Sequence, residues 1–423
     1  MNIGWVSATP IAKTGYGSQT LEVCDRLSAH HKVVCIGQVG DVMVWGGRQT
    51  VTTQSGRNLI VLPLADPKSA IDVINHYYIP EFKLDMIVGF MDAFGIDYLS
   101  QVNVPVVGWI PIDGTFTDMW AYYVRTFHRV VAYSQYGYNQ LRKFFPPGRI
   151  DYVPHGISES FKPKVREHGR KALSRCGIPE QGFLVMTVGA NIGPRKEIPL
   201  MIKTFSRFVE QGHRDAHLYI HTNPNQMWPK GYDLIQWRRM MKMENNVHFP
   251  LRDPIFSPVE NDVLAELHSA ADLYWQNSVA EGFGLPIGEA LACGTPVMVP
   301  ENSAQTELVS QTSSGPGIYD RGILTRSIPD TVYEQIPVYV PQLPTYAVPD
   351  QSDVFDKLNW AYDHQEDLGD MGVCGATFIN EYHRWDRVIH EWLRVLQQVE
   401  SEFEFFEEIQ KYLRVAGSTA SAR

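Results

Sequence analysis

Residues 273–299 read LYWQNSVAEGFGLPIGEALACGTPVMV, and they set the pattern for the chain. A short apolar run ends in a glycine-rich turn, and a helical segment and a second apolar run follow it. This order is typical of a β-α-β unit with parallel strands. Gly282 and Gly284 carry no side chains, so the N–H groups of Phe283 to Leu285 are open at the positive end of the helix dipole. The turn is therefore predicted to bind a phosphate.

The same alternation of short apolar runs and amphipathic segments extends outward from this unit in both directions. It predicts an α/β fold with two doubly wound sheets. Strands of the first sheet are expected near residues 3–7, 33–37, 59–62, 86–90, 104–110, 130–133 and 152–154. The second sheet is expected to hold strands near residues 183–188, 216–221, 246–249, 273–276 and 296–300, with a helix at 199–211. Residues 311–350 lack periodicity and are predicted to form a long surface excursion before helices that run to about residue 415.

A polar segment after Gly156, interrupted by Pro163, predicts a linker between two compact units. The expected divisions are an N-terminal unit at 1–160, a second unit at 161–385, and C-terminal helices at 386–415 that pack back on the first unit. One helical stripe there is apolar and predicts a packed face, either against the chain itself or at a homodimer seam: Val399, Phe403, Phe406, Ile409 and Leu413.

Composition excludes several classes of protein. The 423 residues contain 37 Lys and Arg against 47 Asp and Glu, and the net charge of −10 disfavours a nucleic-acid coat. Five scattered cysteines predict neither a disulfide framework nor a zinc site. No apolar stretch of about 18 residues is present, which disfavours a membrane span. The first residues lack the pattern of a secretion signal, so we expect a cytoplasmic protein.

Two acidic residues frame the glycine-rich turn. Glu289 lies eight residues after Glu281, where its carboxylate is placed to accept hydrogen bonds from ribose hydroxyls, while Glu281 lies at the edge of the loop beside a sugar. The alternative is that both residues only stabilise the N-terminus of the helix.

This E-x7-E spacing resembles that of the retaining GT-B glycosyltransferases of family 4, also known as group 1. Residues 290–297 (ALACGTPV) and 153–157 (VPHGI) are similar to the segments that accompany it in the family. The resemblance implies two Rossmann-like domains that face a cleft, with the acceptor on the N-terminal domain and a nucleotide-diphosphate sugar on the C-terminal one. It implies a UDP- or GDP-sugar as donor and no required metal or other cofactor.

A second turn, residues 188–197, ends a predicted strand with the adjacent cations Arg195 and Lys196. Fixed cations favour the negative charge that grows on a leaving diphosphate. A solvated basic pair is the alternative, although cations at a helix start oppose the dipole. The resemblance supports Arg195 and Lys196 as catalytic residues.

The N-terminal half offers two further candidates. Gly15 and Gly17 follow the first strand, and the resemblance implies that this loop faces the donor diphosphate. Asp113 follows the strand near residue 110, where many relatives have a histidine close to the transferred sugar. Asp113 is expected either to contact acceptor or sugar hydroxyls or to form a simple Asp-Gly turn.

These features predict a retaining glycosyltransferase, with a hexose as the expected sugar. The acceptor class stays open between glycan, lipid, protein, metabolite and modified DNA base. The alternatives are a GT-B epimerase or phosphorylase, a nucleotide-sugar-binding protein without turnover, and a dinucleotide oxidoreductase. Basic and aromatic residues between 133 and 149 are compatible with a weak peripheral membrane contact or with a solvated helix face.

Overall fold

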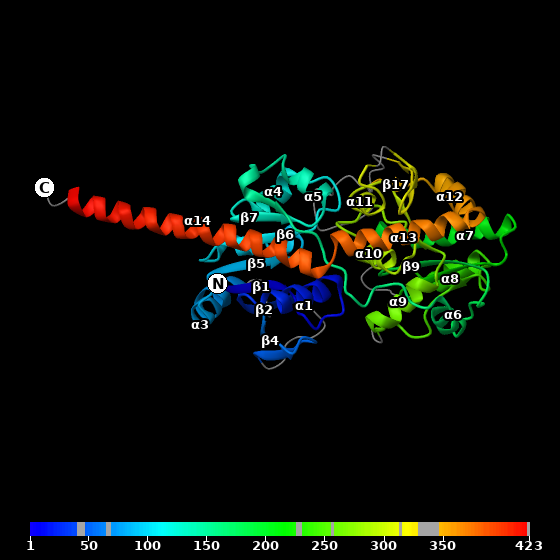
Figure 1. The fold of residues 1–423 in the computed structure, drawn as a ribbon, viewed down its shortest axis with the longest axis horizontal. Helices are drawn as coiled ribbons and strands as arrows, with labels where there is room; N and C mark the ends of the chain where they lie inside the picture. The colour runs from blue at the N-terminus through cyan, green and yellow to red at the C-terminus, as the bar shows by residue number, and fades with distance from the viewer. Residues whose placement is uncertain are drawn as a thin grey trace.

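The computed structural model describes residues 1–39, 47–64, 69–225, 231–254, 258–312, 315–328 and 347–420, with side chains as far as Phe403 except at Pro194. Two mixed α/β units lie next to each other, and a long C-terminal helix runs back along the first unit (Figure 1). Within the described residues, no helix is both long and apolar enough to cross a membrane.

The first unit is built on an eight-stranded sheet with the order β3-β4-β2-β1-β5-β6-β7-β8. All neighbours are parallel except β3 and β4. Its strands are β1 (Asn2–Ala8), β2 (Lys32–Val39), β3 (Gln49–Thr52), β4 (Asn58–Pro63), β5 (Met86–Phe90), β6 (Val106–Ile110), β7 (Arg129–Ala132) and β8 (Ile150–Tyr152). Its helical segments are α1 (Gly15–Leu27), α2 (Ala70–Val73), η1 (Ile74–Tyr78), α3 (Ile79–Phe82), η2 (Ala93–Gly95), η3 (Asp97–Gln101), α4 (Asp118–Val124), α5 (Gln135–Leu141) and η4 (Pro147–Arg149).

The second unit contains a seven-stranded sheet with the order β11-β10-β9-β12-β13-β15-β14. Its strands are β9 (Phe183–Val188), β10 (Ala216–His221), β11 (Val247–His248), β12 (Leu273–Trp275), β13 (Val297–Pro300), β14 (Gly317–Tyr319) and β15 (Gly322–Thr325). A two-stranded ladder joins β16 (Ser327–Ile328) to β17 (Val348–Pro349). Its helical segments are α6 (Arg166–Ser174), η5 (Gly193–Lys196), α7 (Ile198–Glu210), α8 (Leu234–Met240), α9 (Asn261–Ala270), α10 (Leu285–Ala292), α11 (Gln305–Val309), α12 (Gln351–Asp363) and α13 (Gln365–Tyr382). The C-terminal helix α14 (Trp385–Ala420) follows and returns to the first unit (Figure 1).

Two predictions about strands are corrected. The edge strand β3 was not expected, because its sequence QTVT has no apolar run and its side chains alternate between exposed and half-buried. The prediction of an excursion over 311–350 is wrong for residues 317–325, which form an antiparallel hairpin that completes the second sheet. Gly322 fits there because a Cβ would lie 2.1 Å from the Val297 carbonyl oxygen. Residues 313–314 and 329–346 of that segment lie outside the described residues.

The first part of α14 packs into the core of the N-terminal unit. Val388, Trp392 and Val395 are fully buried, and the Trp392 ring lies 5.4 Å from Trp5 and 5.3 Å from Trp109 between centroids. Val399 of the predicted stripe is buried in the same core. The ring centroids of Phe403 and His128 are 4.7 Å apart. The side chains of Phe406, Ile409 and Leu413 lie outside the described set. The described part of the stripe therefore packs within the chain.

The chain crosses between the two units twice, and the two crossings touch. The N–H of Ile157 donates to the His383 carbonyl oxygen at 2.8 Å, and a ring nitrogen of His383 lies 3.1 Å from the His155 carbonyl oxygen. Gly156 faces the Trp385 ring, which a Cβ would approach to 2.4 Å. This contact fixes the place where the two units join.

Candidate active site

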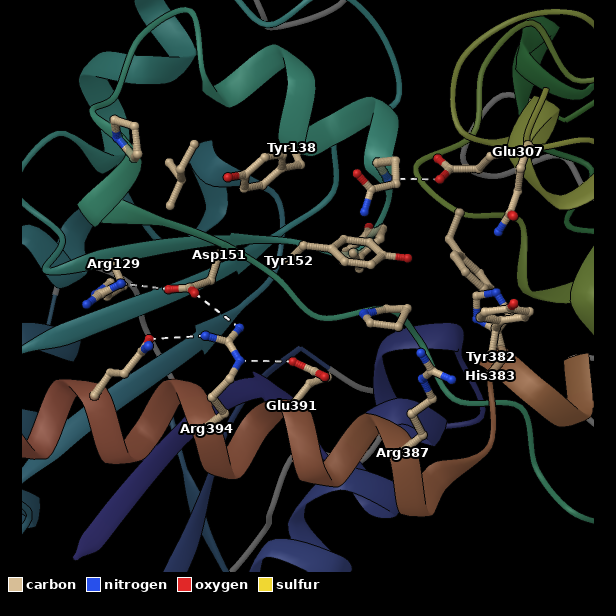
Figure 2. A pocket seen from close by; sticks show the side chains of 18 of the residues that line it. Arg129, Tyr138, Asp151, Tyr152, Glu307, Tyr382, His383, Arg387, Glu391 and Arg394 are labelled. Atoms are coloured by element: carbon tan, nitrogen blue, oxygen red, sulfur yellow. Dashed lines mark hydrogen bonds and ion pairs between the residues drawn. The ribbon is translucent and has the colours of Figure 1, made fainter. Parts of the chain in front are cut away.

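A large cavity near the junction has a volume of about 1200 Å³ and lies between β8, α5, α11 and α14 (Figure 2). Several of its charged groups are engaged in ion pairs or hydrogen bonds. Asp151 accepts from Arg129 at 2.9 Å and from Arg394 at 3.3 Å. Glu307, from the second unit, accepts from the N–H groups of Gln135 and Tyr136 at the start of α5, at 2.9 and 3.2 Å. The Glu307 contacts connect the second unit to the first, whereas the Asp151 pairs connect β7, β8 and α14.

A smaller cavity, of about 400 Å³, lies where the carboxyl ends of both sheets meet. We call it the central cavity. Tyr133 and Phe283 line both cavities and separate them. The second unit contributes Arg195 and residues 281–286 to the lining of the central cavity. The first unit, together with the crossing at 155–157, contributes Gly15, Tyr16, Phe90, Asp92, Pro111, Asp113, Tyr133 and His155. In open α/β sheets, ligands bind at the carboxyl ends of the strands, so this is the candidate active site.

The glycine-rich turn presents its backbone to this cavity as the sequence predicts. Gly284 has φ 91°, a left-handed conformation that glycine adopts without strain, and α10 begins at Leu285 with no side-chain cap. The N–H groups of Phe283, Gly284 and Leu285 donate to no other group in the described part of the chain. The positive end of α10 is thus open for an anion.

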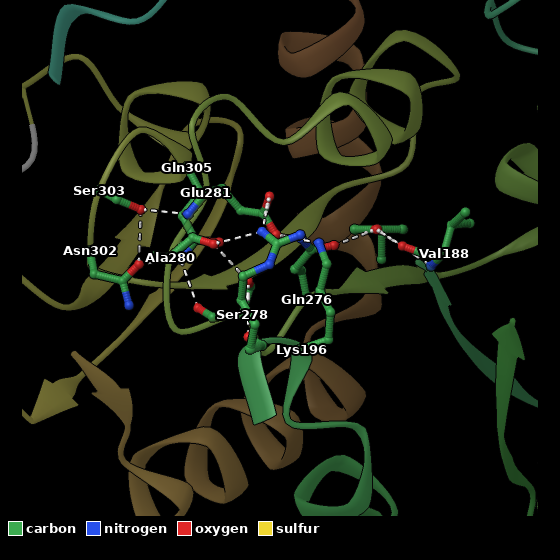
Figure 3. Close-up of polar contacts among 11 residues, drawn as sticks. Val188, Lys196, Gln276, Ser278, Ala280, Glu281, Asn302, Ser303 and Gln305 are labelled. Carbon is green, nitrogen blue, oxygen red and sulfur yellow. Dashed lines mark hydrogen bonds and ion pairs between the residues drawn. The ribbon is translucent and has the colours of Figure 1, made fainter. Parts of the chain in front are cut away.

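Glu281 is the centre of a hydrogen-bonded network (Figure 3). It forms a short ion pair with Lys196, a 3.3 Å contact with Arg195, and a 2.5 Å hydrogen bond from the Gln276 amide. Burial alone would raise the pKa of Glu281, but the charges of Lys196 and Arg195 lower it to about 2. The carboxylate is therefore ionised at any ordinary pH.

Arg195 and Lys196 are held in place by the loop before Glu281. The Arg195 carbonyl oxygen accepts from the Val279 N–H at 2.9 Å and from the Ser278 hydroxyl at 3.2 Å. The Lys196 side chain is only 12% exposed, whereas that of Arg195 is 40% exposed. Burial lowers the pKa of Lys196 although Glu281 opposes that shift. Lys196 is therefore not part of a solvated basic pair.

Two carboxylates line the opposite wall, and the sequence reasoning named only Asp113. Asp92 lies two residues beyond β5 and accepts a hydrogen bond from the Tyr16 hydroxyl at 3.1 Å. Burial and the neighbouring charge of Asp113 raise the pKa of Asp92 to about 6. Burial also raises the pKa of Asp113. A polar residue at the carboxyl end of a predicted strand was the available signal for Asp92, but many loops carry one.

The remaining predicted residues divide between the cavity and its surroundings. Gly15 lines the cavity. Gly17 does not: its N–H donates to Thr14 Oγ1 at 3.1 Å, and a Cβ would lie 2.1 Å from the Ala12 carbonyl oxygen. Glu289 is half-buried on α10 and does not line the cavity, and burial raises its pKa to about 7.

His155 lines the cavity and was not proposed from the sequence. It is 4% exposed, and burial, followed by the nearby His383, lowers its pKa well below the ordinary value. Its Nδ1 has no hydrogen-bond partner among the described residues. No group of three or more His, Cys, Asp or Glu side chains within the described ranges is arranged to hold a metal ion.

Comparison with known proteins identifies part of the chain by sequence. Residues 173–319 match the family model for glycosyl transferases group 1. A D-inositol 3-phosphate glycosyltransferase of Salinispora arenicola is 29% identical over 203 residues, which are 44% of this chain and 43% of that protein. One from Mycobacterium leprae is 28% identical over 153 residues, 36% of this chain and 32% of that protein. The match thus spans less than half of these curated relatives.

Solved structures match over nearly the whole chain. Sucrose-phosphate synthase from Thermosynechococcus elongatus has a TM-score of 0.71 at 15% identity and covers 95% of this chain and 100% of its own. Anabaena Alr3699/HepE in complex with UDP and glucose has a TM-score of 0.69 at 14% identity, over 94% and 99%. The predicted α/β class with two Rossmann-like sheets is confirmed. The sequence similarity to the group 1 glycosyl transferases covers residues 173–319, and the chain as a whole has the GT-B fold.

Proposed function

We propose that this protein is a retaining glycosyltransferase that moves a hexose from a UDP- or GDP-sugar to an acceptor hydroxyl. One observation carries the proposal: Arg195, Glu281 and the open N–H groups of Phe283 to Leu285 line a single cavity between two sheets. Cations and an open helix N-terminus are what a diphosphate needs, and the neighbouring carboxylate suits the sugar attached to it. The structure of HepE with UDP and glucose supports a nucleotide sugar as ligand.

The proposed division of labour follows the two units. Residues 161–385 bind the donor, residues 1–160 bind the acceptor, and the C-terminal helices beyond 385 tie the second unit to the first. The described contacts of α14 with Trp5 and Trp109 support the last point.

When the sugar leaves, negative charge develops on the diphosphate. Lys196 and Arg195 are already held near that position by Glu281 and by the loop at 278–280. Groups fixed before the reaction stabilise the developing charge without a cost of reorganisation. We propose that these cations and the dipole of α10 neutralise the leaving group, so that no divalent metal is required for it.

Glu281 is proposed to bind the sugar and not to attack it. Its carboxylate is ionised and accepts from Lys196, Arg195 and Gln276, which lowers its nucleophilicity. Lone pairs left over accept hydrogen bonds from sugar hydroxyls. With Glu281 engaged in this way, we propose retention by departure and attack on one face, in which the leaving phosphate takes the acceptor proton. Asp113 is proposed to hold a hydroxyl of the sugar or acceptor.

The decisive test begins with donor binding. UDP-, GDP-, ADP- and CDP-sugars are screened by thermal shift, because a ligand that binds only the native state raises the melting temperature. The donor that binds is then incubated with acceptors, and the anomeric configuration of the product is read from NMR couplings. A product with inverted configuration would refute retention, and binding without transfer would indicate a nucleotide-sugar-binding protein. Equal turnover in EDTA and in Mg²⁺ is expected.

A further inference from the structure

We infer that the acceptor of this site is an uncharged polyhydroxyl compound, and that the wall formed by Asp92, Asp113, Tyr16 and Tyr133 rejects acceptors that carry a phosphate near the reacting hydroxyl. This inference rests on the proposed function and narrows its substrate class. Asp92 is assigned as a specificity residue, which the sequence motifs do not indicate.

The two walls of the central cavity differ in charge. Among the described lining residues, the first unit contributes the carboxylates of Asp92 and Asp113 but no Lys or Arg. The second unit contributes Arg195, which contacts Glu281 at 3.3 Å and lies beside the open turn at 283–285. The positive charge of the cavity is therefore already assigned to Glu281 and to the donor diphosphate.

The carboxylates of the acceptor wall interact electrostatically with each other and with the charged groups of the donor wall. The charge of Asp113 raises the pKa of Asp92, and Arg195 lowers it. Burial raises the pKa of the Tyr133 hydroxyl, and the charges of Asp92, Asp113 and Glu281 raise it further. A phosphate added here would be a further negative charge beside carboxylates that already repel each other.

The same wall suits hydroxyl groups. Ionised carboxylates accept O–H hydrogen bonds that are shorter and stronger than those between neutral groups. The Tyr16 hydroxyl orients Asp92, and the Tyr16 ring packs on Phe90 with centroids 5.0 Å apart. Phe90 also meets Tyr133 edge-on at 6.5 Å. The carboxylates thus lie beside aromatic rings of the cavity lining, of which the half-buried Tyr16 ring can pack against the apolar side of a sugar or cyclitol.

The test compares matched ligands that differ only in a phosphate. The protein is first saturated with the nucleoside diphosphate of the donor that the screen identifies. It is then titrated by calorimetry at pH 8 with glucose and glucose 6-phosphate, and with inositol and inositol 3-phosphate. At this pH Asp92 is ionised. We expect the phosphorylated member of each pair to bind at least about tenfold more weakly, which corresponds to about 1.4 kcal/mol.

Variants locate the cause of the preference. Asp92→Asn and Asp113→Asn keep the side-chain shape and remove the charge, so the double variant is expected to lose most of the discrimination against phosphate. Asp72→Asn, an exposed residue of α2 outside the cavity, is the control for net charge and should leave the preference unchanged. Unaltered melting with nucleotide shows that the donor site of each variant is intact.

The outcomes separate the two claims. No melting shift with any nucleotide sugar refutes the proposed function. A normal melting shift with nucleotide sugar, combined with equal affinity for the phosphorylated and the unphosphorylated ligand of every pair, overturns the inference alone. Absence of binding by both ligands of every pair has the same consequence. So does tighter binding of the phosphorylated member, or a preference that the double variant retains.

Discussion

The two walls of the central cavity are built in opposite ways. The donor wall comes from two contiguous segments, 193–197 and 278–286, whose backbones are hydrogen-bonded to each other and whose charges form one network around Glu281. The acceptor wall is assembled from the ends of β1, β5, β6 and β7, which are far apart in the sequence. Binding of the donor is thus proposed to depend on residues that form short sequence motifs. The acceptor wall is built from separate loops, so each of its residues can be replaced without changing the others.

The largest effect is expected on the donor wall, at Lys196. Lys196→Ala should reduce turnover by about 10²- to 10³-fold, because it removes a buried cation that stabilises the leaving group. Initial rates at saturating donor would measure it. Lys203→Ala, an exposed lysine on α7, serves as the control. Near-native turnover in a folded Lys196→Ala protein would end the claim that catalysis resides in this wall.

The junction between the walls is the next test. Gly156→Ala places a Cβ about 2.4 Å from the Trp385 ring, and overpacking of this kind costs about 1–3 kcal/mol. Because each wall stays intact and only their relative position changes, transfer should fall more than nucleotide binding. Gly148→Ala has no atom within 4 Å of the new Cβ and is the matched control. Equal melting temperatures of the two variants would contradict the close contact.

Glu289 tests whether the donor wall extends beyond the lining residues. Its pKa is about 7 in the folded protein, against an ordinary value of 4.5. The unfolded chain therefore loses this proton first, and the residue lowers stability progressively from pH 4.5 to 7 and by a constant amount above that. Glu289→Gln should be more stable relative to wild type at pH 8 than at pH 5, by on the order of 2–3 kcal/mol.

Guanidinium unfolding at the two pH values measures this difference, with the exposed Glu180→Gln as the reference. A ribose contact predicts in addition that the same variant binds nucleotide more weakly. If only stability changes, Glu289 belongs to the helix and not to the ligand site.

The smallest effect is expected on the acceptor wall. Tyr16→Phe keeps the ring on Phe90 but removes the hydrogen bond to Asp92, at a cost of about 0.5–1.5 kcal/mol. That hydrogen bond favours the ionised carboxylate, so the pKa of Asp92 should rise above about 6. NMR titration of the carboxyl carbon would show the shift. A simultaneous loss of nucleotide affinity would blur the contrast between the walls.

This contrast also explains how far sequence reasoning reached. Strands β5 and β9 were predicted to the residue, because buried parallel strands are nearly continuous apolar runs, and β10 was predicted to the residue although it contains His217 and His221. The short hairpin at 317–325 was missed, since Gly-rich strands of three or four residues carry no periodicity. Arg195 and Lys196 were proposed as adjacent cations in one turn, and Glu281 was proposed from its E-x7-E spacing to Glu289. Asp92 and His155 were not, because only the folded sheets bring them to the cavity.

The contact between residues 155–157 and 383–385 has a mechanical consequence. Two chain segments that cross between the units at one place are expected to form a hinge. They allow the units to tilt toward each other, but they oppose translation and twisting of one unit against the other. The alignment of the two units thus depends on a few backbone atoms at the edge of the central cavity, which His155 also lines.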